Sequence, residues 1–444
     1  MEKYEISSLT MMMAMTHYFG QTREDKATMN IPFVMHLKGE FDKKKLEDAL
    51  QKILSTKIMN TWFSVEDNRF FANEKEYVPY VLEDEDVEGD TLEEKLQKVA
   101  EIAKELTVQP LALFEKDQRQ YFFKVYNLQE DYHILYMSVH HAFLDFGSIM
   151  IALKSLYSVY NGGEVLFEGS SEFSKFMGEE IEFLKSEGAA HEEAYWAKEL
   201  QGAKPVDFSK LPVQTRTDIN PDDLMIIFEK SELKEMAEKF RTSVFNIMML
   251  IAHMAIAKTN DSNDTMTQYA ISNRPDAEYR YTLGCITRML TNRAIFDDDM
   301  TVGELNKLMR KKIGDGYQNR HVAGKTPLGS IPYVVAYEDL DDLDVLPYFN
   351  GEPVQMDYVH IARTMEFLCI LLIPIGFDKL SIGVITDVAR FGEHAETFLR
   401  NAQLAFRFLK NHPDRTFGDY MRKDVTLDTM ELLDQEEGYE LIAI

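Results

Sequence analysis

Apolar and polar positions follow two recurring patterns along the chain. Short apolar runs predict strands, and apolar residues spaced three or four apart predict amphipathic helices. Residues 42–54 show such a helical stripe, with Asp42 placed to cap the helix at its start. The predicted helices span residues 42–54, 92–106, 149–160, 173–187, 231–240, 244–258, 302–314 and 397–409, and one more ends at Leu200. The predicted strands span residues 31–37, 121–126, 133–139, 224–228, 265–271, 331–337, 367–375 and 379–386.

These elements predict a mixed α/β (α+β) fold, because strands and helices intermingle without a regular βαβ repeat. Residues 244–258 are apolar nearly all round, so this helix should be buried. The glycine-rich phosphate loops GxGxxG and GxxxxGK[ST] do not occur, which disfavours the doubly wound nucleotide enzymes. Residues 188–221 contain the helix that ends at Leu200 and then an irregular stretch with Pro and Asp, and we expect the crossover between domains near here. We therefore expect one lobe at residues 1–180, a second at 181–420 and an acidic, linker-like tail at 421–444.

Composition narrows the classes of function. Of 444 residues, 48 are Lys or Arg and 75 are Asp or Glu, giving a net charge of −27 that should repel nucleic acid and anionic lipid. The two cysteines, Cys285 and Cys369, form no CxxC or His/Cys cluster, so neither a disulfide framework nor a structural zinc site is predicted. Glu2 and Glu5 replace the basic start of a signal peptide, and no apolar run reaches membrane-spanning length. We expect a cytoplasmic protein without a membrane span.

The sharpest local feature is the sequence His140-His141-Ala142-Phe143-Leu144-Asp145. It follows a predicted strand, where neighbouring side chains point to opposite faces, so only one of the two histidines can face a given cleft. Histidine has an ordinary pKa near 6.5 and is suited to moving protons at neutral pH. Alternatively, both histidines are hydrogen-bonded residues of the core.

Asp145 also has two interpretations. It either caps the helix that follows or is a buried acid that needs a cation, since an unpaired buried charge is very costly. A metal site is not predicted, because adjacent strand histidines diverge and no further ligand cluster accompanies them.

The HHAFLD sequence resembles the HHxxxDG motif of nonribosomal peptide synthetase condensation domains, which belong to the chloramphenicol acetyltransferase-like superfamily. Further segments resemble those domains in the same order over about residues 1–410. They are KGEFDKKKLEDALQKIL, Thr61–Phe63, EAYWAKELQG at 193–202, ISNRP at 271–275, Leu283-Gly284 followed by Arg293, and ITDVARF at 385–391.

The resemblance implies two acetyltransferase-like lobes in a V, with a tunnel open at both ends. It implies that His141 is the catalytic histidine, that Asp145 orients the motif, and that Arg293 pairs with Asp145. His140 would be the motif's supporting histidine. A thioester donor and an amine would reach His141 from opposite sides, and His141 would either take the amine proton or hold the amine by a hydrogen bond. The implied substrates are acyl-CoA or a phosphopantetheine-linked acyl thioester, the implied partner is a carrier protein, and no cofactor is permanently bound.

Several positions depart from the family pattern. Phe146 stands where the motif has glycine, and Gly147 follows it. Either the turn is rebuilt around Gly147 or the ring of Phe146 narrows the tunnel. The consequence is altered donor specificity, a ring that merely joins the core, or an impaired site. Arg288 replaces an asparagine of the pattern, and Thr56 replaces a histidine.

The ends of the chain suggest a place in an assembly line. The resemblance begins near Met1, and residues 430–437 resemble the linker that joins a condensation domain to a downstream adenylation domain. We therefore expect a starter condensation domain that joins a fatty acyl group to an aminoacyl group on a carrier protein. Two alternatives remain: a free-standing O-acyltransferase of an alcohol or sugar, and a non-catalytic module that docks carrier proteins.

Overall fold

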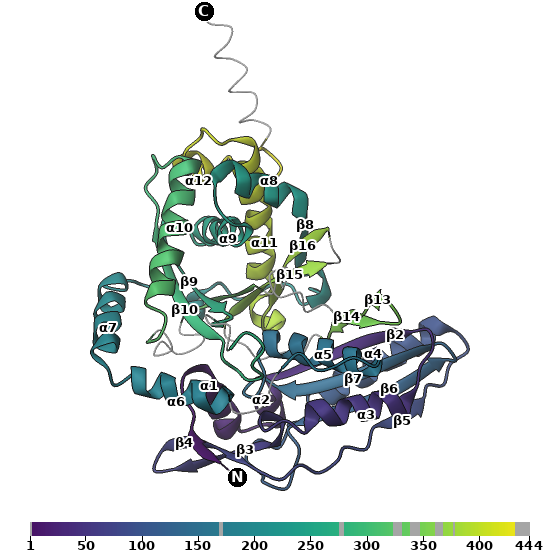
Figure 1. The fold of residues 1–444 in the computed structure, drawn as a ribbon. Coiled ribbons are helices and arrows are strands. Elements are labelled where there is room, and N and C mark those ends of the chain that lie inside the picture. The colour runs from purple at the N-terminus through teal and green to yellow at the C-terminus, as the bar shows by residue number, and fades with distance from the viewer. Residues whose placement is uncertain are drawn as a thin grey trace, which may run out of the picture. The chain divides into compact units, whose positions relative to one another are not determined.

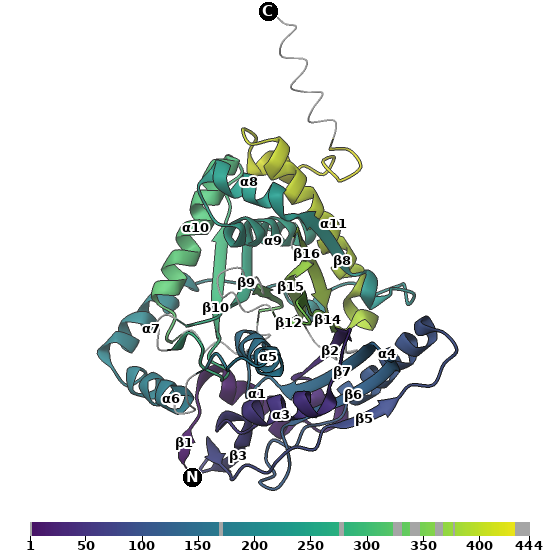
Figure 2. The same cartoon turned by 45° about the vertical axis from the view of Figure 1, so that its right-hand side comes forward.

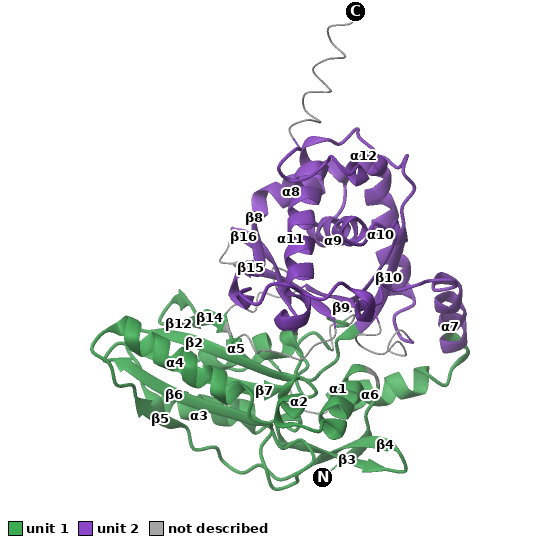
Figure 3. Cartoon of the chain, turned by 180° about the vertical axis from the view of Figure 1, so that it is seen from behind, with its two compact units in different colours: residues 1–188, 272–288, 340–363 green, residues 189–271, 289–339, 364–444 purple. Residues whose placement is uncertain are grey.

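The computed structural model describes residues 2–167, 172–274, 279–322, 331–337, 347–359, 367–375 and 378–430. It contains two compact units, coloured separately in Figure 3. Unit 1 comprises Met1–Gly188, Ser272–Arg288 and Leu340–Arg363, and unit 2 comprises Ala189–Ile271, Met289–Asp339 and Thr364–Ile444.

The division differs from the two continuous lobes that the sequence suggests, because unit 1 includes two later segments. Residues 284–287 belong to it because they hydrogen-bond to Asp145 and Ser148. Residues 355–358 belong to it because they pair with a strand of its main sheet.

The main sheet of unit 1 has five strands in the order β14-β2-β7-β6-β5. They are β14 (Gln355–Tyr358), β2 (Asn30–Lys38), β7 (Tyr132–His140), β6 (Tyr121–Gln129) and β5 (Glu83–Asp86). Neighbours are antiparallel, except that β5 and β6 are parallel. The predicted strands at 31–37, 121–126 and 133–139 are confirmed. The register places His140 opposite Asn30, so β7 ends directly at the histidine motif.

Helices cover both faces of this sheet (Figures 1 and 2). Val34 packs in a core with α4 (Leu92–Thr107). Its neighbours Phe33 and Met35 contact α5 (Phe146–Tyr160) on the opposite face. Helix α3 (Lys43–Leu54) packs along α5 and is capped by Asp42 as predicted, with the Lys45 N–H donating to Asp42 Oδ1 at 3.1 Å.

The rest of unit 1 consists of short elements. A three-stranded sheet contains β1 (Lys3–Glu5), β4 (Arg69–Glu74) and β3 (Thr61–Glu66), and β12 (Tyr348–Phe349) pairs with β13 (Glu352–Pro353). The remaining helices are α1 (Ser8–Phe19), α2 (Arg23–Ala27), the 3₁₀ turn Ile58–Asn60 and α6 (Glu172–Phe183).

Unit 2 is built on a six-stranded mixed sheet in the order β10-β9-β11-β15-β16-β8. The strands are β10 (Arg288–Ile295), β9 (Asp264–Ile271), β11 (Tyr333–Tyr337), β15 (Leu368–Ile375), β16 (Lys379–Ile385) and β8 (Met225–Glu229). Strand β11 is parallel to β9 and β15, whereas β16 is antiparallel to β15 and β8. The 3₁₀ turns Phe208–Lys210 and Pro221–Asp223 precede β8.

Helix α9 (Val244–Asn260) is buried as predicted, and α8 (Lys230–Phe240), α10 (Val302–Gln318) and α11 (Val388–Asn411) pack against it. Unit 2 also contains α7 (Glu187–Glu199) and α12 (Phe417–Met421). Among the helices the structure describes, no single one is long and apolar enough to cross a membrane. Within the described ranges, one pair of helices, α8 and α9, meets that length and composition together, across a bend of 95°.

The predicted acidic tail at 421–444 is described as far as residue 430. This part returns to α11 through an ion pair of 3.0 Å between Asp428 and Arg400, and Val425 is buried. Most of the linker-like segment at 430–437 lies outside the described residues.

Candidate active site

The histidine motif occupies the connection between β7 and α5 in unit 1. The His141 N–H donates to the Met29 carbonyl at 2.9 Å, which holds the chain beside β2 after β7 has ended. Asp145 then caps α5, because its Oδ1 accepts from the Ser148 N–H at 2.8 Å. The first histidine of the motif therefore ends strand β7, and Asp145 is the N-cap of helix α5.

His140 is a core histidine. It is fully buried, and its Nδ1 accepts from the Ala142 N–H at 3.1 Å, so the ring proton of the neutral form lies on Nε2. Its ring stands edge-on to His17 of α1, with centroids 5.5 Å apart. Burial, followed by His17 and His141, lowers the pKa of His140 well below its ordinary value. His140 is therefore neutral at physiological pH.

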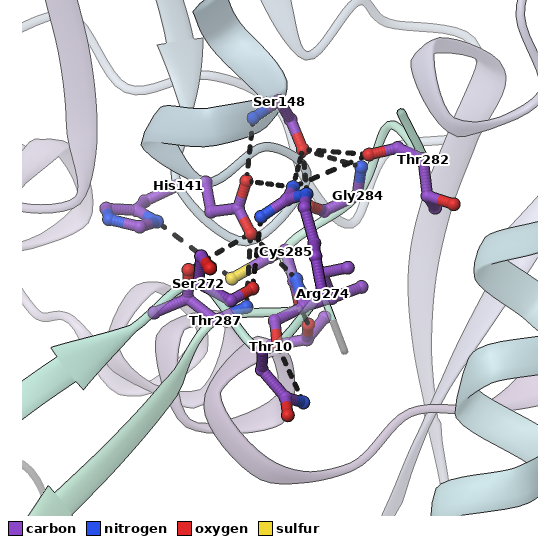
Figure 4. Close-up of polar contacts among 12 residues, drawn as sticks. Thr10, His141, Ser148, Ser272, Arg274, Thr282, Gly284, Cys285 and Thr287 are labelled. Atoms are coloured by element: carbon purple, nitrogen blue, oxygen red, sulfur yellow. Dashed lines mark hydrogen bonds and ion pairs between the residues drawn. The ribbon is translucent and has the colours of Figure 1, made fainter. Parts of the chain in front are cut away.

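His141 lies in a different environment. It is half-buried, and its Nδ1 is 4.0 Å from the sulfur of Cys285. Figure 4 draws this contact as a dashed line. One histidine of the pair is thus sealed in the core while the other is partly accessible. This matches the expectation that neighbouring residues at a strand end point in different directions.

The carboxylate of Asp145 is buried and accepts five hydrogen bonds. Oδ1 accepts from Arg274 Nη2 at 2.7 Å and from the Ser148 N–H at 2.8 Å. Oδ2 accepts from the Ile286 and Thr287 N–H groups at 3.1 Å each and from Thr287 Oγ1 at 3.0 Å. Burial alone would raise the pKa of Asp145, but Arg274 and the other donors hold it below the ordinary value. Asp145 is therefore an anion that organises the site and carries no proton.

The cation paired with Asp145 is Arg274, so the predicted Arg293 partner is wrong. Arg293 belongs to unit 2, where Nε and Nη2 bind Asp264 at 2.9 and 2.7 Å. Its Nη1 binds the carbonyls of Glu199 and Gln201 at 3.3 and 2.8 Å. Arg293 thus ties the end of α7 to β9.

The need for a cation beside Asp145 follows from its burial, and this part of the prediction holds. Arg274 lies in the segment ISNRP, which the sequence singles out without a role. The sequence alone does not show whether Arg274 or Arg293 lies in unit 1 beside Asp145, because this depends on the path of the chain in three dimensions.

Gly147 explains how the motif tolerates Phe146. A Cβ at Gly147 would lie 2.9 Å from Arg274 Nη1, so a side chain at this position would displace the guanidinium that binds Asp145. Phe146 is the first residue of α5, and its half-buried ring lies 6.4 Å from that of Phe33 on β2. The glycine required by the site is therefore the second residue of the helix.

Three further residues of the site were missed by sequence reasoning. Ser148 Oγ accepts from Arg274 at 2.9 Å and from the Gly284 N–H at 3.0 Å, and donates to the Gly284 carbonyl at 2.7 Å. Thr287 and Cys285 complete the surroundings of Asp145 and His141. Their residue types carry no pattern that could have marked them. Within the described ranges, no group of three or more His, Cys, Asp or Glu side chains is arranged to hold a metal.

Comparison with known families decides the class of protein. The family model described as the condensation domain matches residues 5–335. The chain belongs to the condensation-domain family. Condensation domains of nonribosomal peptide synthetases are acyltransferases that form amide bonds, and the resemblance predicted from the sequence is confirmed.

Individual relatives agree with this assignment. The chain is 23% identical over 290 residues to surfactin synthase subunit 1 of Bacillus subtilis (strain 168), covering 62% of this chain and 8% of the relative. It is 20% identical over 327 residues to bacitracin synthase 3 of Bacillus licheniformis, covering 72% of this chain and 5% of the relative. The chain thus spans less than a tenth of the length of these synthetases.

Solved structures confirm the fold. The first condensation domain of the calcium-dependent antibiotic synthetase, in complex with a substrate analogue, has a TM-score of 0.74 at 15% identity, covering 94% of this chain and 99% of that one. A mutant starter condensation domain of rhizomide synthetase in complex with C8-CoA has a TM-score of 0.73 at 14% identity, covering 94% and 96%. The predicted acetyltransferase-like fold class is therefore confirmed.

Proposed function

We propose that this chain joins an acyl thioester to an aminoacyl group held on a carrier protein, with His141 as the catalytic residue. In this reaction the amine nitrogen attacks the thioester carbonyl, a C–N bond forms, the C–S bond breaks and the thiol leaves. In one version the amine proton passes to His141 and then to the departing sulfur. In the other version His141 holds the amine by a hydrogen bond, and the proton passes directly from the amine to the departing sulfur. Both versions place the imidazole at the reacting nitrogen.

The observation that carries this proposal is the contrast between the three polar residues of the motif. His140 is buried and neutral, and Asp145 is saturated by five donors. His141 is the half-buried member of the three, and its imidazole lies beside the Cys285 sulfur. Because neither neighbour can exchange a proton readily, His141 is the residue of the motif that we assign to the substrate amine.

We further propose that the donor is a fatty acyl thioester, on CoA or on a carrier protein. This is the starter type of condensation, and the structural likeness to a starter domain crystallised with C8-CoA supports it. The thioester supplies the driving force, so no permanently bound cofactor is required. A phosphopantetheinylated carrier protein, a downstream adenylation domain and a cytoplasmic location belong to the same proposal. The tunnel implied by the resemblance stays a prediction.

The test is product analysis by mass spectrometry. The full chain is incubated with a panel of acyl-CoA donors and an aminoacyl-loaded carrier protein, and the mass on the carrier is measured. We expect an acylated aminoacyl carrier with wild type and with His191→Ala, which removes an exposed histidine of α7. His141→Ala should give no product above background.

The other outcomes identify the alternatives. Esters formed from an alcohol or sugar, with no amide, would establish an O-acyltransferase. Carrier binding without transfer from any donor would establish a docking module. Amide formation by His141→Ala at the wild-type rate would remove His141 from its role.

A further inference from the structure

Residues 284–287 connect the Asp145 carboxylate to His141. The N–H groups of Ile286 and Thr287 donate to Asp145, and the neighbouring Cys285 places its sulfur 4.0 Å from His141 Nδ1. Figure 4 shows His141 and Cys285, with a dashed line between the imidazole and the sulfur. The four-residue segment therefore contacts both the fixed anion and the partly accessible histidine.

The backbone on either side of Cys285 is held in place. Gly284 exchanges two hydrogen bonds with Ser148 Oγ, at 3.0 and 2.7 Å, and Thr10 Oγ1 donates to the Cys285 carbonyl at 3.0 Å. A Cβ at Gly284 would lie 2.0 Å from the ring of Phe173, which shows how closely the chain passes α6. The sulfur is thus presented to His141 from a backbone fixed on both sides.

The chemical state of this sulfur limits what it can do. Burial, followed by the charge of Asp145, raises the pKa of the Cys285 thiol well above its ordinary value. The group is therefore a neutral thiol, and a thiolate nucleophile that would accept the acyl group is disfavoured. A neutral thiol is a weak donor and a weak acceptor, so its effect on His141 is to occupy one edge of the ring.

We propose that Cys285 is a positioning residue for His141: its sulfur accepts the Nδ1–H, so that Nε2 is the nitrogen that meets the substrate amine. This inference rests on the proposed function, because only this tautomer leaves a lone pair on Nε2. The opposite arrangement, with S–H donating to Nδ1, puts the ring proton on Nε2 and leaves it unable to act as a base. The hydrogen bond at one ring nitrogen sets the protonation of the other.

The test reads the tautomer directly. The full chain is labelled with ¹⁵N-histidine, the His141 signals are assigned by comparison with His141→Gln, and the nitrogen that carries the proton is identified from ¹⁵N shifts. Wild type should show the Nδ1–H form. Cys285→Ala should raise the population of the Nε2–H form severalfold. Cys285→Ser, whose hydroxyl also accepts but reaches less far, should lie between them.

Cys369→Ala is the matched control, because it removes the other thiol of the chain from β15 in unit 2 and should leave the His141 signals unchanged. Should Cys285→Ala fail to fold, Cys285→Ser carries the test through its shift in the same direction. The proposal would be overturned if the His141 ring of wild type carried its proton on Nε2, or if the tautomer populations were the same in wild type and in both Cys285 variants.

Activity provides the second readout. Cys285→Ala should lower kcat for amide formation at least about tenfold with little change in KM, and Cys285→Ser should restore part of it. If the tautomer responds to Cys285 but wild type forms no amide, the proposed function fails and the positioning role stands. If amide forms and the His141 tautomer is unchanged by the Cys285 substitutions, the positioning role is refuted and the proposed function stands.

Discussion

Replacing Arg274 by methionine should destabilise unit 1 strongly, because it leaves the Asp145 carboxylate buried without its cation. The two side chains are 2% and 1% exposed, and Nη2 lies 2.7 Å from Oδ1. Removing one partner of such a pair costs about 3–5 kcal/mol, since the remaining charge cannot reach water. Four other hydrogen bonds still reach Asp145, so we expect a loss in the free energy of unfolding of about 3 kcal/mol, at the lower end of that range.

The two tryptophans of the chain provide separate probes for this loss. Trp62 lies on β3 in unit 1, and Trp196 lies on α7 in unit 2. Urea unfolding is followed by fluorescence in Trp196→Phe and Trp62→Phe backgrounds, so that each unit is observed alone. Arg274→Met should lower the midpoint of the Trp62 transition.

Arg293→Met is the matched control, because it removes an arginine of unit 2. It should lower the Trp196 transition instead, by about 1.5–3 kcal/mol for charged hydrogen bonds that are partly exposed. An unchanged Trp62 transition in Arg274→Met, or an equal shift of that transition in Arg293→Met, would refute the assignment of the Asp145 partner.

The destabilisation caused by Arg274→Met should depend on pH, because it depends on the charge of Asp145. In wild type the pKa of Asp145 is held below the ordinary value, so its contribution to stability is present above that ordinary value and is lost as the pH falls through the lowered pKa. Without Arg274 the opposing effect of burial raises the pKa, and the carboxyl takes up a proton at higher pH. The destabilisation by Arg274→Met should therefore be larger at pH 7 than at pH 4.

Two further predictions concern a glycine and a buried histidine. Gly147→Ala should lower the rate of amide formation at least about tenfold, because its Cβ would lie 2.9 Å from Arg274 Nη1, whereas Gly178→Ala, with no atom within 4 Å, should leave that rate unchanged. An unaffected Gly147→Ala enzyme would show that Arg274 can move without consequence. Burial lowers the pKa of His253 to about 3, so the unfolded state binds this proton first and unit 2 should lose stability as the pH falls below about 6.5. His253→Gln should reduce that loss in the Trp196 transition, and an identical acid dependence would contradict it.

Local pattern was enough to locate the motif and most of the elements around it. Strands β2, β6 and β7 and helices α3 and α9 follow from apolar runs and stripes because the apolar residues of each are buried in its own unit. Helix α1 has the sequence SLTMMMAMTHYF, which lacks a polar face and so gives no amphipathic signal. Helix α11 begins nine residues before the predicted start at Thr397, and Gly392 lies inside it, where a Cβ would meet Ile219 at 2.9 Å.

The partners of Asp145 could not be obtained in this way. Burial of an acid requires a cation, but Arg274 and Arg293 both lie in segments that fit the family, and only the three-dimensional path selects one. Ser148, Cys285 and Thr287 contribute through backbone and side-chain contacts that no residue spacing encodes. The chemistry of the site was therefore predictable at the level of residue type, whereas the identity of the contacting residues was not.

The central claim is that the His141 imidazole acts on the substrate amine during amide formation, as a base or as a hydrogen-bond acceptor. Its most direct test is the single-turnover rate of amide formation with saturating acyl-CoA and aminoacyl carrier, in wild type and in His141→Ala. Loss of a general base costs about 10²–10⁴-fold in rate, so we expect a decrease of at least about a hundredfold with the Trp62 unfolding transition unchanged. A rate within a few fold of wild type would contradict the account.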